Sequence, residues 1–508
     1  MREYIVTVED PSVWDTLWNE LTVNGLGDNF IPQRSVEVLN ERPFNDFCAH
    51  FNLTDEEAIE LRNDPRIQHV ELQADLKEGV GKGFLAIRPG LYDKSYTTTA
   101  AMKNWGLIRA SSQENPFAST SSLTTDFNSH DLEGEGVDLI MMDSGVEAGH
   151  PELALNADGT GGSRVVNFDW HSLGVPGTPT SAAIGGYLGD SDGHGTNCAS
   201  IAAGNTCGWA SRANIYSLRI FAGNSIRGAG YLGSISSDIA FDLVRAFHLQ
   251  KIAQGITRPT VCSNSWGYYA QYSGMTATVY RGTSYPGTST NSTYGQVNYV
   301  HGYQLNYLDV SVENAAAAGV IMVGAAGNYY HKIDVPGGLD YNNYWVYGNN
   351  VENVPYHRGS SPTRAPSMIN VGAIDNSTVE QKAYFSESGP RVDIYSPGVM
   401  IMGAYANKAY QTAAVADPRN PTYYLNKISG TSQATPQVAG VVSCLLGARP
   451  SATVDQIKAW LTEKSTKNVL VEGADPSYAN QHGLQGGANR ILRRTVDKAS
   501  LRGWMTSS

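Results

Sequence analysis

The chain has 508 residues and a formal net charge of −12, with 41% hydrophobic and 10% aromatic residues. This length allows a large buried core and exceeds one typical domain, and the composition excludes an intrinsically disordered protein. The negative charge disfavours nucleic acid and anionic membranes as partners. No apolar run reaches the length of a membrane span, and the first residues lack a signal-peptide pattern. We expect a globular protein that is cytoplasmic or released without a signal, and a virus-encoded origin fits equally well.

The first 76 residues predict a small separate domain. Apolar and β-branched residues predict strands at 4–8, 36–39, 46–51 and 69–72, and helical spacing or a capping box predicts helices at 13–21 and 54–61. The order β-α-β-β-α-β is that of a split, ferredoxin-like α+β domain. Residues 77–104 follow with no steady hydrophobic period, so the sequence predicts a linker there.

Four polar residues stand at the ends of apolar segments further along. Asp143 closes an apolar run typical of a strand buried on both faces, and Asn328 closes a second one. His194 stands between two glycines at the start of a small-residue helix, and Ser432 begins a long buried helix with Pro436 in its predicted first turn. Each residue alone suits a structural role, such as an ordinary N-cap for Ser432. Together they supply a nucleophile, a base, a carboxylate and an oxyanion donor.

Five short motifs carry a family resemblance. In chain order they are Asp143-Ser144-Gly145, His194-Gly195-Thr196, Ser265-Trp266-Gly267, Ala325-Ala326-Gly327-Asn328 and Gly430-Thr431-Ser432. On these motifs, which span about residues 105–447, the chain resembles the subtilisin-like serine peptidases (subtilases), and it is similar to their proteinase K-like branch. The resemblance implies a doubly wound, mostly parallel α/β sheet within a peptidase domain at 105–508.

The resemblance also implies the roles of individual residues. Asp143, His194 and Ser432 would form the catalytic triad, and Asn328 would stabilise the oxyanion. An extended substrate would lie between two backbone edges. The residues expected to bind it are Gly228, Ala229, Gly230, Tyr231, Ser265, Trp266, Gly267, Ala325, Ala326 and Gly327.

Two of these edges need comment. The glycine-rich stretch 228–233 also matches a dinucleotide-binding fingerprint, but no acid ends the next strand, so we interpret it as the substrate edge. Trp266 stands where a smaller apolar residue is usual in the family, and we expect it to reshape the specificity pockets.

The N-terminal domain resembles a subtilase prodomain. In that family such a domain assists folding and then inhibits the cleft, so we expect self-processing between 76 and 104 and the domain itself as an intramolecular inhibitor. An unrelated interaction module is the alternative. No cofactor is expected to be required, and calcium is expected only as a structural ion at residues that the sequence does not identify.

Two insertions interrupt the family pattern, at 268–307 and 329–360. Loops of this length are usually functional or disordered. They would screen substrates at the rim of the cleft or form surface decoration. After them, Ser361-Pro362 aligns with a family bond that is often cis.

Five cysteines are an odd number without the spacing of a disulfide scaffold or a zinc site, so we expect free buried thiols. Taken together, the sequence predicts a serine endopeptidase that is made as a self-processing zymogen and acts on polypeptides. The alternative is a catalytically silent subtilase fold with a structural or binding role.

Overall fold

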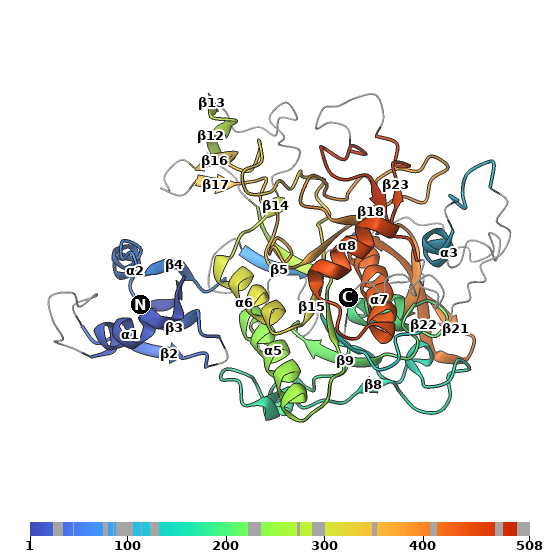
Figure 1. Cartoon of the computed structure of the whole chain (residues 1–508), viewed down its shortest axis with the longest axis horizontal. Coiled ribbons are helices and arrows are strands. Elements are labelled where there is room, and N and C mark those ends of the chain that lie inside the picture. Colours follow the sequence, from blue (N-terminus) through green and yellow to red (C-terminus); the bar gives the residue numbers. More distant parts are fainter. Residues whose placement is uncertain are drawn as a thin grey trace.

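The computed structural model of the whole chain places a small N-terminal domain beside a larger body (Figure 1). The structure describes residues 1–23, 34–43, 45–74, 80–84, 86–87, 105–112, 114–121, 132–190, 192–221, 235–271, 275–286, 300–347, 353–406, 414–472 and 481–494. For residues 80–84, 86–87 and 347 only the backbone is described.

The N-terminal domain is a four-stranded antiparallel sheet with strand order β2-β3-β1-β4, covered by two helices. Its elements follow the β-α-β-β-α-β order that the sequence predicts. Leu17 and Leu21 of the first helix pack on Phe51 in the core of the domain. The elements are β1 (Arg2–Val8), α1 (Trp14–Thr22), β2 (Glu37–Asn40), β3 (Cys48–Leu53), α2 (Asp55–Leu61) and β4 (Ile67–Leu72).

The body is built on a nine-stranded sheet with order β23-β24-β19-β18-β15-β10-β7-β9-β8, in which β23 alone runs antiparallel to its neighbour. Parallel sheets of this kind need helices on both faces. The strands are β7 (Asp138–Asp143), β8 (Val165–Val166), β9 (Asn214–Arg219), β10 (Thr260–Asn264), β15 (Ile321–Ala325), β18 (Ile369–Ile374), β19 (Ile394–Pro397), β23 (Thr466–Lys467) and β24 (Arg490–Ile491).

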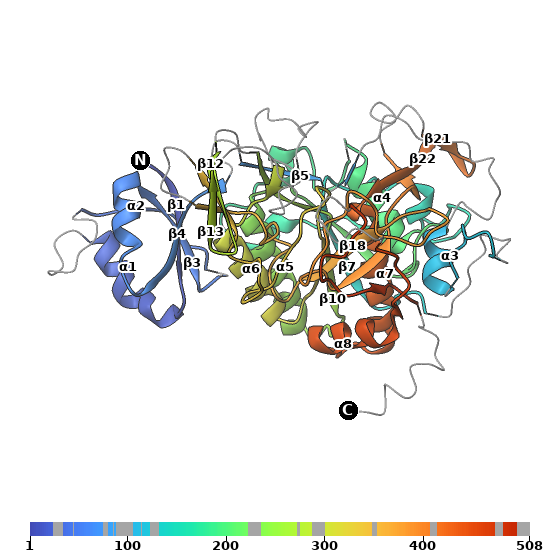
Figure 2. The ribbon, with the colours of Figure 1, turned by 90° about the horizontal axis from the view of Figure 1, so that it is seen from above.

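Helices cover both faces of this sheet (Figure 2). Leu139 and Met141 of β7 face the core that contains α4 and α7, whereas Ile140 and Met142 face the core that contains α5 and α6. This is the doubly wound α/β architecture that the sequence predicts. The helices of the body are α3 (Trp105–Ser111), α4 (His194–Ala203), α5 (Ser237–Ala253), α6 (Asn306–Ala317), α7 (Thr431–Ala448) and α8 (Val454–Lys464).

Residues 77–104 contain strands where a linker without regular structure was predicted. β5 (Val80–Phe84) pairs antiparallel with β11 (Trp266–Gln271), and β6 (Ala86–Ile87) pairs antiparallel with the end of β22 (Asn420–Gly430). These strands are held by edges of the body that are distant in the sequence. A hydrophobic period within the segment was therefore not needed, which is why the pattern gave no sign of them.

Parts of the two insertions pair in one sheet, rather than forming the two separate loops that were expected. Its strand order is β13-β12-β16-β17, so the first insertion pairs with the second. Met275, Trp345, Val354 and Tyr356 form its small core. The first insertion also ends earlier than predicted, because residue 306 already belongs to α6. The strands are β12 (Met275–Tyr280), β13 (Thr283–Pro286), β16 (Tyr344–Tyr347) and β17 (Asn353–Pro355).

The body contains two further small sheets. β11 lies between β5 and β14 (Val300–Gly302), and β22 lies between β20 (Ile401–Tyr405) and β21 (Val415–Asp417). The Ser361–Pro362 peptide bond is cis, as its alignment suggested. All five cysteines are free and buried, as expected from their spacing. None of the helices in the described ranges is long and apolar enough to cross a membrane.

Helix α7 passes very close to α4 at Gly440. A Cβ at position 440 would lie 2.3 Å from the carbonyl oxygen of Ala202 and 3.0 Å from Cβ of Trp209. Backbone atoms cannot move aside as a flexible side chain would, so the two helices can approach this closely only where α7 carries glycine.

We predict that Gly440→Ala destabilises the fold by about 1–3 kcal/mol, because overpacking outweighs the gain in helix propensity. The measurement is denaturant unfolding in a Ser432→Ala background, which prevents self-digestion. Ser443→Ala in the same helix is the control, since it removes only a hydroxyl that donates to the carbonyl of Ala439. A Gly440→Ala midpoint equal to that of the control would contradict the close approach.

Candidate active site

The four predicted chemical residues meet at one edge of the sheet. Asp143 is the last residue of β7, and Asn328 follows β15 by three residues. Because β7, β10 and β15 are parallel neighbours, their carboxyl ends lie together. His194 is the first residue of α4, and Ser432 is the second residue of α7.

Asp143 and His194 form a buried pair. Nδ1 of the imidazole lies 2.8 Å from Oδ1 of Asp143, and the N–H of Ser144 donates to the same oxygen at 2.7 Å. An ionised carboxylate only accepts hydrogen bonds, so the proton of the neutral ring sits on Nδ1. Nε2 is then the basic nitrogen of His194.

The surroundings of His194 favour its protonated form. Burial alone would lower the pKa of the imidazole, but the negative charge of Asp143 and the nearby Cys198 outweigh burial and raise it well above 6.5. Sγ of Cys198 lies 3.8 Å from Nδ1 and 3.9 Å from Nε2 of the ring. The imidazolium that a proton transfer would create is therefore stabilised in advance.

Ser432 is held by two hydrogen bonds with Ser265, the residue just after β10. The Ser432 hydroxyl donates to the Ser265 carbonyl at 2.9 Å, and the Ser265 hydroxyl donates to the Ser432 carbonyl at 3.0 Å. The thiol of Cys198 donates to that same carbonyl at 3.4 Å. Contacts from β10 and α4 thus meet at one residue of α7.

Pro436 explains why the Ser432 carbonyl is available. The sequence placed Pro436 in the first turn, which is wrong, because α7 begins at Thr431 and Pro436 is its sixth residue. Within an α-helix the N–H of residue 436 would bond to the carbonyl of residue 432, and proline has no N–H. The carbonyl is released from the helix ladder and accepts Ser265 and Cys198 instead.

Asn328 is oriented by Thr431, a residue to which sequence reasoning gave no role. Both the N–H and the hydroxyl of Thr431 donate to Oδ1 of Asn328 at 2.9 Å. A backbone N–H can only donate, so the amide oxygen must face Thr431 and the Nδ2 group must face away. Nδ2 is buried and has no hydrogen-bond partner among the described residues. Nδ2 is therefore an unused donor, and the amide that carries it is bonded to Thr431, the residue before Ser432.

Asp190 is a second residue that the sequence did not reveal. Its buried carboxylate accepts the N–H of Gly193 at 2.8 Å and both the N–H and the hydroxyl of Thr196, at 2.8 and 2.7 Å. It also accepts the Ser144 hydroxyl at 2.8 Å. Asp190 therefore caps α4 in place of the N-cap glycine and ties the Asp143 loop to it. An acid three residues before a glycine N-cap was the available signal.

The predicted substrate edges are described in part. Trp266 and Gly267 pair with Phe84 and Gly83 of β5, so this edge already holds an extended strand. The Trp266 side chain is buried in the core against Phe221 and Phe241, and its backbone pairs with β5. Residues Ala325, Ala326 and Gly327 leave the neighbouring end of β15. The opposite edge, Gly228, Ala229, Gly230 and Tyr231, lies outside the described residues.

In the described part of the chain, one cluster of side chains has metal-ligating geometry, and it consists of Asp143, His194 and Cys198. These atoms are already joined to one another in the site above, so the cluster gives no sign of a separate ion site. Structural calcium stays a prediction from the family resemblance.

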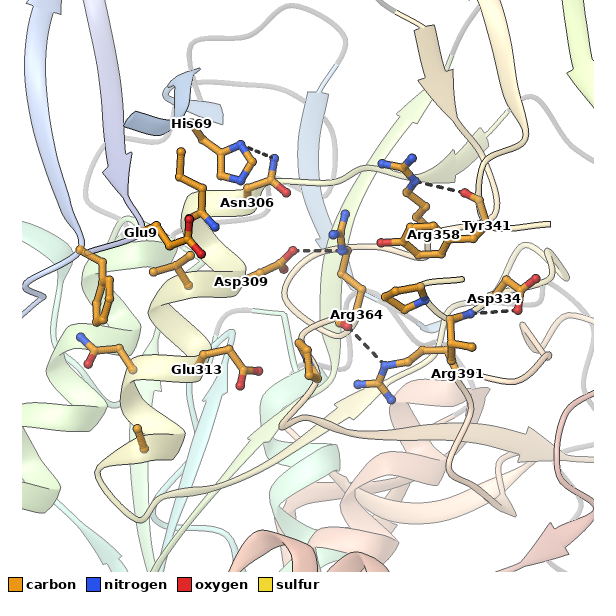
Figure 3. A pocket seen from close by; sticks show the side chains of 18 of the residues that line it. Glu9, His69, Asn306, Asp309, Glu313, Asp334, Tyr341, Arg358, Arg364 and Arg391 are labelled. Carbon is orange, nitrogen blue, oxygen red and sulfur yellow. Dashed lines mark hydrogen bonds and ion pairs between the residues drawn. The ribbon is translucent and has the colours of Figure 1, made fainter. Parts of the chain in front are cut away.

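A cavity of about 850 Å³ lies between the N-terminal domain and the body (Figure 3). His69 of β4 lines it together with Asn306 and Asp309 of α6. Its charged groups largely pair with each other, as in the Arg364–Asp309 ion pair at 3.0 Å. None of the four chemical residues lines it, so the cavity is separate from the candidate active site.

Comparison with known proteins identifies similar chains. The family profile described as the subtilase family, Peptidase_S8, matches residues 134–485. A subtilisin-like protease of Coccidioides posadasii is 25% identical over 454 residues, covering 85% of this chain and 68% of the relative. The alkaline serine exoprotease A of Vibrio alginolyticus is 24% identical, covering 91% and 61%. This chain thus spans about two thirds or less of the length of these relatives.

Among solved structures, fervidolysin from Fervidobacterium pennivorans, a keratinolytic enzyme related to subtilisin, matches with a TM-score of 0.54 and 17% identity. The match covers 96% of this chain and 60% of that one. At this identity the likeness concerns the fold alone, and it includes the N-terminal part of the chain.

We predict that the His194 imidazole titrates well above pH 6.5 in the folded protein, because Asp143 stabilises its charged form. Ring NMR in a Ser432→Ala background measures this. Asp143→Asn removes the carboxylate but keeps the burial, so the pKa should then fall below 6.5. A titration at or below 6.5 that does not respond to Asp143→Asn would contradict the pairing.

Proposed function

Because its family profile covers most of the chain, the protein belongs to the subtilase family of serine peptidases, and we propose that it cuts internal peptide bonds with Asp143, His194 and Ser432. The observation that carries the proposal is the buried Asp143–His194 hydrogen bond beside a serine at the start of α7. This pairing of base and orienting carboxylate activates a serine that is otherwise a weak nucleophile.

In the proposed mechanism Nε2 of His194 takes the hydroxyl proton of Ser432 as the oxygen attacks the peptide carbonyl. Asp143 holds the ring in the required tautomer and stabilises the imidazolium. His194 then gives the proton to the leaving amine, which departs and leaves an acyl-enzyme on Ser432. Water attacks that ester with His194 again as the base, and the second product leaves.

The negative charge on the attacked carbonyl oxygen needs donors. Nδ2 of Asn328 is buried without a partner among the described residues, and the N–H of Ser432 belongs to the first turn of α7, where helix N–H groups are unsatisfied. A preorganised side-chain donor of this kind is worth roughly 3–4 kcal/mol in the transition state.

A fluorophosphonate probe and a peptide substrate test the function together. An active peptidase labels at Ser432 and hydrolyses the peptide, and His194→Ala loses both while keeping the fold. The alternative of a silent subtilase fold requires neither labelling nor hydrolysis in the purified wild type. The presence of every triad member favours the peptidase.

We further propose that the protein is made as a self-inhibited zymogen. The N-terminal domain is anchored to the body by buried charges, since Arg42 pairs with Asp242 at 2.8 Å and with Asp238 at 3.3 Å. Both acids belong to α5. Breaking a buried pair of this kind would leave an uncompensated charge, which costs about 3–5 kcal/mol.

A second anchor leads toward the cleft. The carboxylate of Glu71 accepts the N–H of Tyr307 at 3.0 Å, at the positive end of α6, and the Tyr307 hydroxyl accepts the N–H of Ala74 at 3.3 Å. The segment that follows contains β5 and β6.

The register of those strands supports a particular cut. β5 ends opposite Trp266, and β6 begins opposite Gly430, two residues before Ser432. One residue, Leu85, separates the strands in the sequence. Pairing of β5 and β6 with edges near Ser432 supports self-cleavage in this stretch of the chain. We propose that self-cleavage occurs at one of the two peptide bonds of Leu85.

We predict that Asn328→Ala lowers kcat by on the order of 10²–10³ with little change in KM, because the lost donor acts on the transition state. Steady-state kinetics on the processed enzyme measure it. Thr431→Val should give a smaller kcat loss, since it removes one of the two bonds that orient the amide. A change confined to KM would mean that Asn328 binds the ground-state substrate.

We also predict that the wild-type chain cleaves itself once near residue 85, whereas Ser432→Ala stays full length. N-terminal sequencing of the larger product should begin at Leu85 or Ala86. A cut elsewhere between 76 and 104 would overturn the register, and an intact wild type that still hydrolyses a test peptide would make the N-terminal domain a permanent module.

A further inference from the structure

Two short segments leave neighbouring strands on either side of the nucleophile. Asn264, the last residue of β10, lies opposite Gly324 of β15, so Ser265–Gly267 and Ala325–Gly327 begin side by side. The first segment contacts Ser432 through the Ser432–Ser265 hydrogen bond, and in the second the N–H of Gly327 donates to the hydroxyl of Thr431, the residue before Ser432, at 3.3 Å. On the proposed function, they form the walls between which the acyl-side residue of a substrate lies, the residue whose carbonyl is attacked.

Glu387 reaches the second wall. Its N–H donates to the Gly327 carbonyl at 3.0 Å. A Cβ built on Gly327 would lie 2.4 Å from Cδ and 2.5 Å from Oε1 of Glu387. The carboxyl group therefore occupies the space that a side chain at position 327 would take. This glycine is needed both for its φ of +131° and for the close approach.

The Glu387 carboxyl group has no adequate partner in the described structure. The residue is 1% exposed, and Oε1 has no hydrogen bond and no ion-pair partner within the described ranges. The nearby ammonium of Lys382 donates to the carbonyls of Ala383 and Ser386 at 3.0 and 2.6 Å instead. Burial raises the pKa of Glu387 well above its usual value, and Lys382 offsets this only in part.

Two tyrosines also belong to the environment of Glu387. The rings of Tyr269 and Tyr329 lie 4.8 Å apart. Burial, followed by the charge of Glu387, raises the pKa of both phenols. Behind the first wall, a Cβ on Gly267 would lie 2.7 Å from the Ser360 hydroxyl. The Glu387 carboxyl group and the Ser360 hydroxyl thus lie at the two positions toward which Cβ atoms on Gly327 and Gly267 would point.

We propose that Glu387 is the specificity-determining residue for the acyl-side position, and that the processed enzyme prefers lysine or arginine there. This rests on the proposed peptidase function. The aliphatic stem of either side chain would lie along the tyrosine rings, and its cationic end would pair with the buried Glu387 carboxyl group. An unpaired buried acid is costly, and a cationic substrate removes that cost.

Self-cleavage beside Leu85 does not depend on the proposed preference for lysine or arginine. The N-terminal domain holds β5 and β6 at the nucleophile through contacts outside the cleft, such as Arg42 with Asp242. Intramolecular placement replaces binding energy from the side-chain pocket, so a single cut beside Leu85 is compatible with a pocket that selects cations among free substrates.

The test is a series of peptides that differ only in the acyl-side residue, with kcat/KM measured on the processed enzyme. Lysine and arginine should exceed leucine by at least about 10-fold. Glu387→Gln, which keeps the shape and removes the charge, should bring that ratio close to 1 through a loss of kcat/KM on the lysine and arginine peptides. A denaturant midpoint equal to that of the wild type shows that the variant is folded. Glu463→Gln, at an exposed pair with Lys464, is the matched control and should keep the wild-type ratio.

A second measurement needs no variant. A peptide aldehyde ending in arginine should inhibit the wild type more strongly than the same peptide ending in leucine. Equal rates for lysine and leucine, or a ratio unaffected by Glu387→Gln, overturns the inference and leaves the peptidase intact. Failure to hydrolyse any peptide or to label with fluorophosphonate overturns the proposed function, and the inference with it.

Discussion

The reciprocal hydrogen bonds between Ser265 and Ser432 are the contact on which the candidate site depends. They join the carboxyl end of β10 to the start of α7, and so set the nucleophile against the central strands of the sheet. The contact exists because Pro436 cannot bond to the Ser432 carbonyl, which is left free to accept from outside the helix. Proline normally disrupts a helix, but Pro436 frees the carbonyl acceptor that fixes the position of α7.

The same edge of the sheet carries a dense buried polar network. Some of its side chains use all their hydrogen-bonding groups, and others have buried atoms without a partner in the described chain. Asp190 uses its carboxylate oxygens to cap α4 and to hold Ser144, and Thr431 uses both of its donors on Asn328. These groups are fully committed and therefore rigid. The donor Nδ2 of Asn328 and the acceptor Oε1 of Glu387 are buried without partners in the described chain. Oδ2 of Asp143 and Oε1 of Gln433 are also buried without partners among the described residues. On the proposals above, substrate atoms would complete the hydrogen bonding of Asn328 and Glu387.

The sequence predicts the parts of this structure that rest on local pattern. Buried strands ending in Asp143 and Asn328, and the small-residue helices that begin near His194 and Ser432, have the periodicity of their final elements. Strands β5 and β6 could not be predicted, because their stability comes from edges that lie far away in the sequence. The joint sheet of the two insertions has the same origin. Glu387 stands in a turn whose sequence carries no motif, and only the fold brings it to Gly327.

The N-terminal domain is held mainly by contacts outside the cleft. Binding of this domain and selection among substrates can therefore depend on different residues. The edge at Trp266 and Gly267 pairs with backbone, so it accepts the chain's own segment and any extended substrate alike. Affinity for the domain comes from Arg42 and Glu71, which a free substrate lacks. On the proposals above, selectivity among free substrates would then come from side-chain contacts such as the one at Glu387. A domain held in this way could occupy the cleft without matching its preference, and after the proposed cleavage its affinity would depend on buried charges rather than on the cut strand.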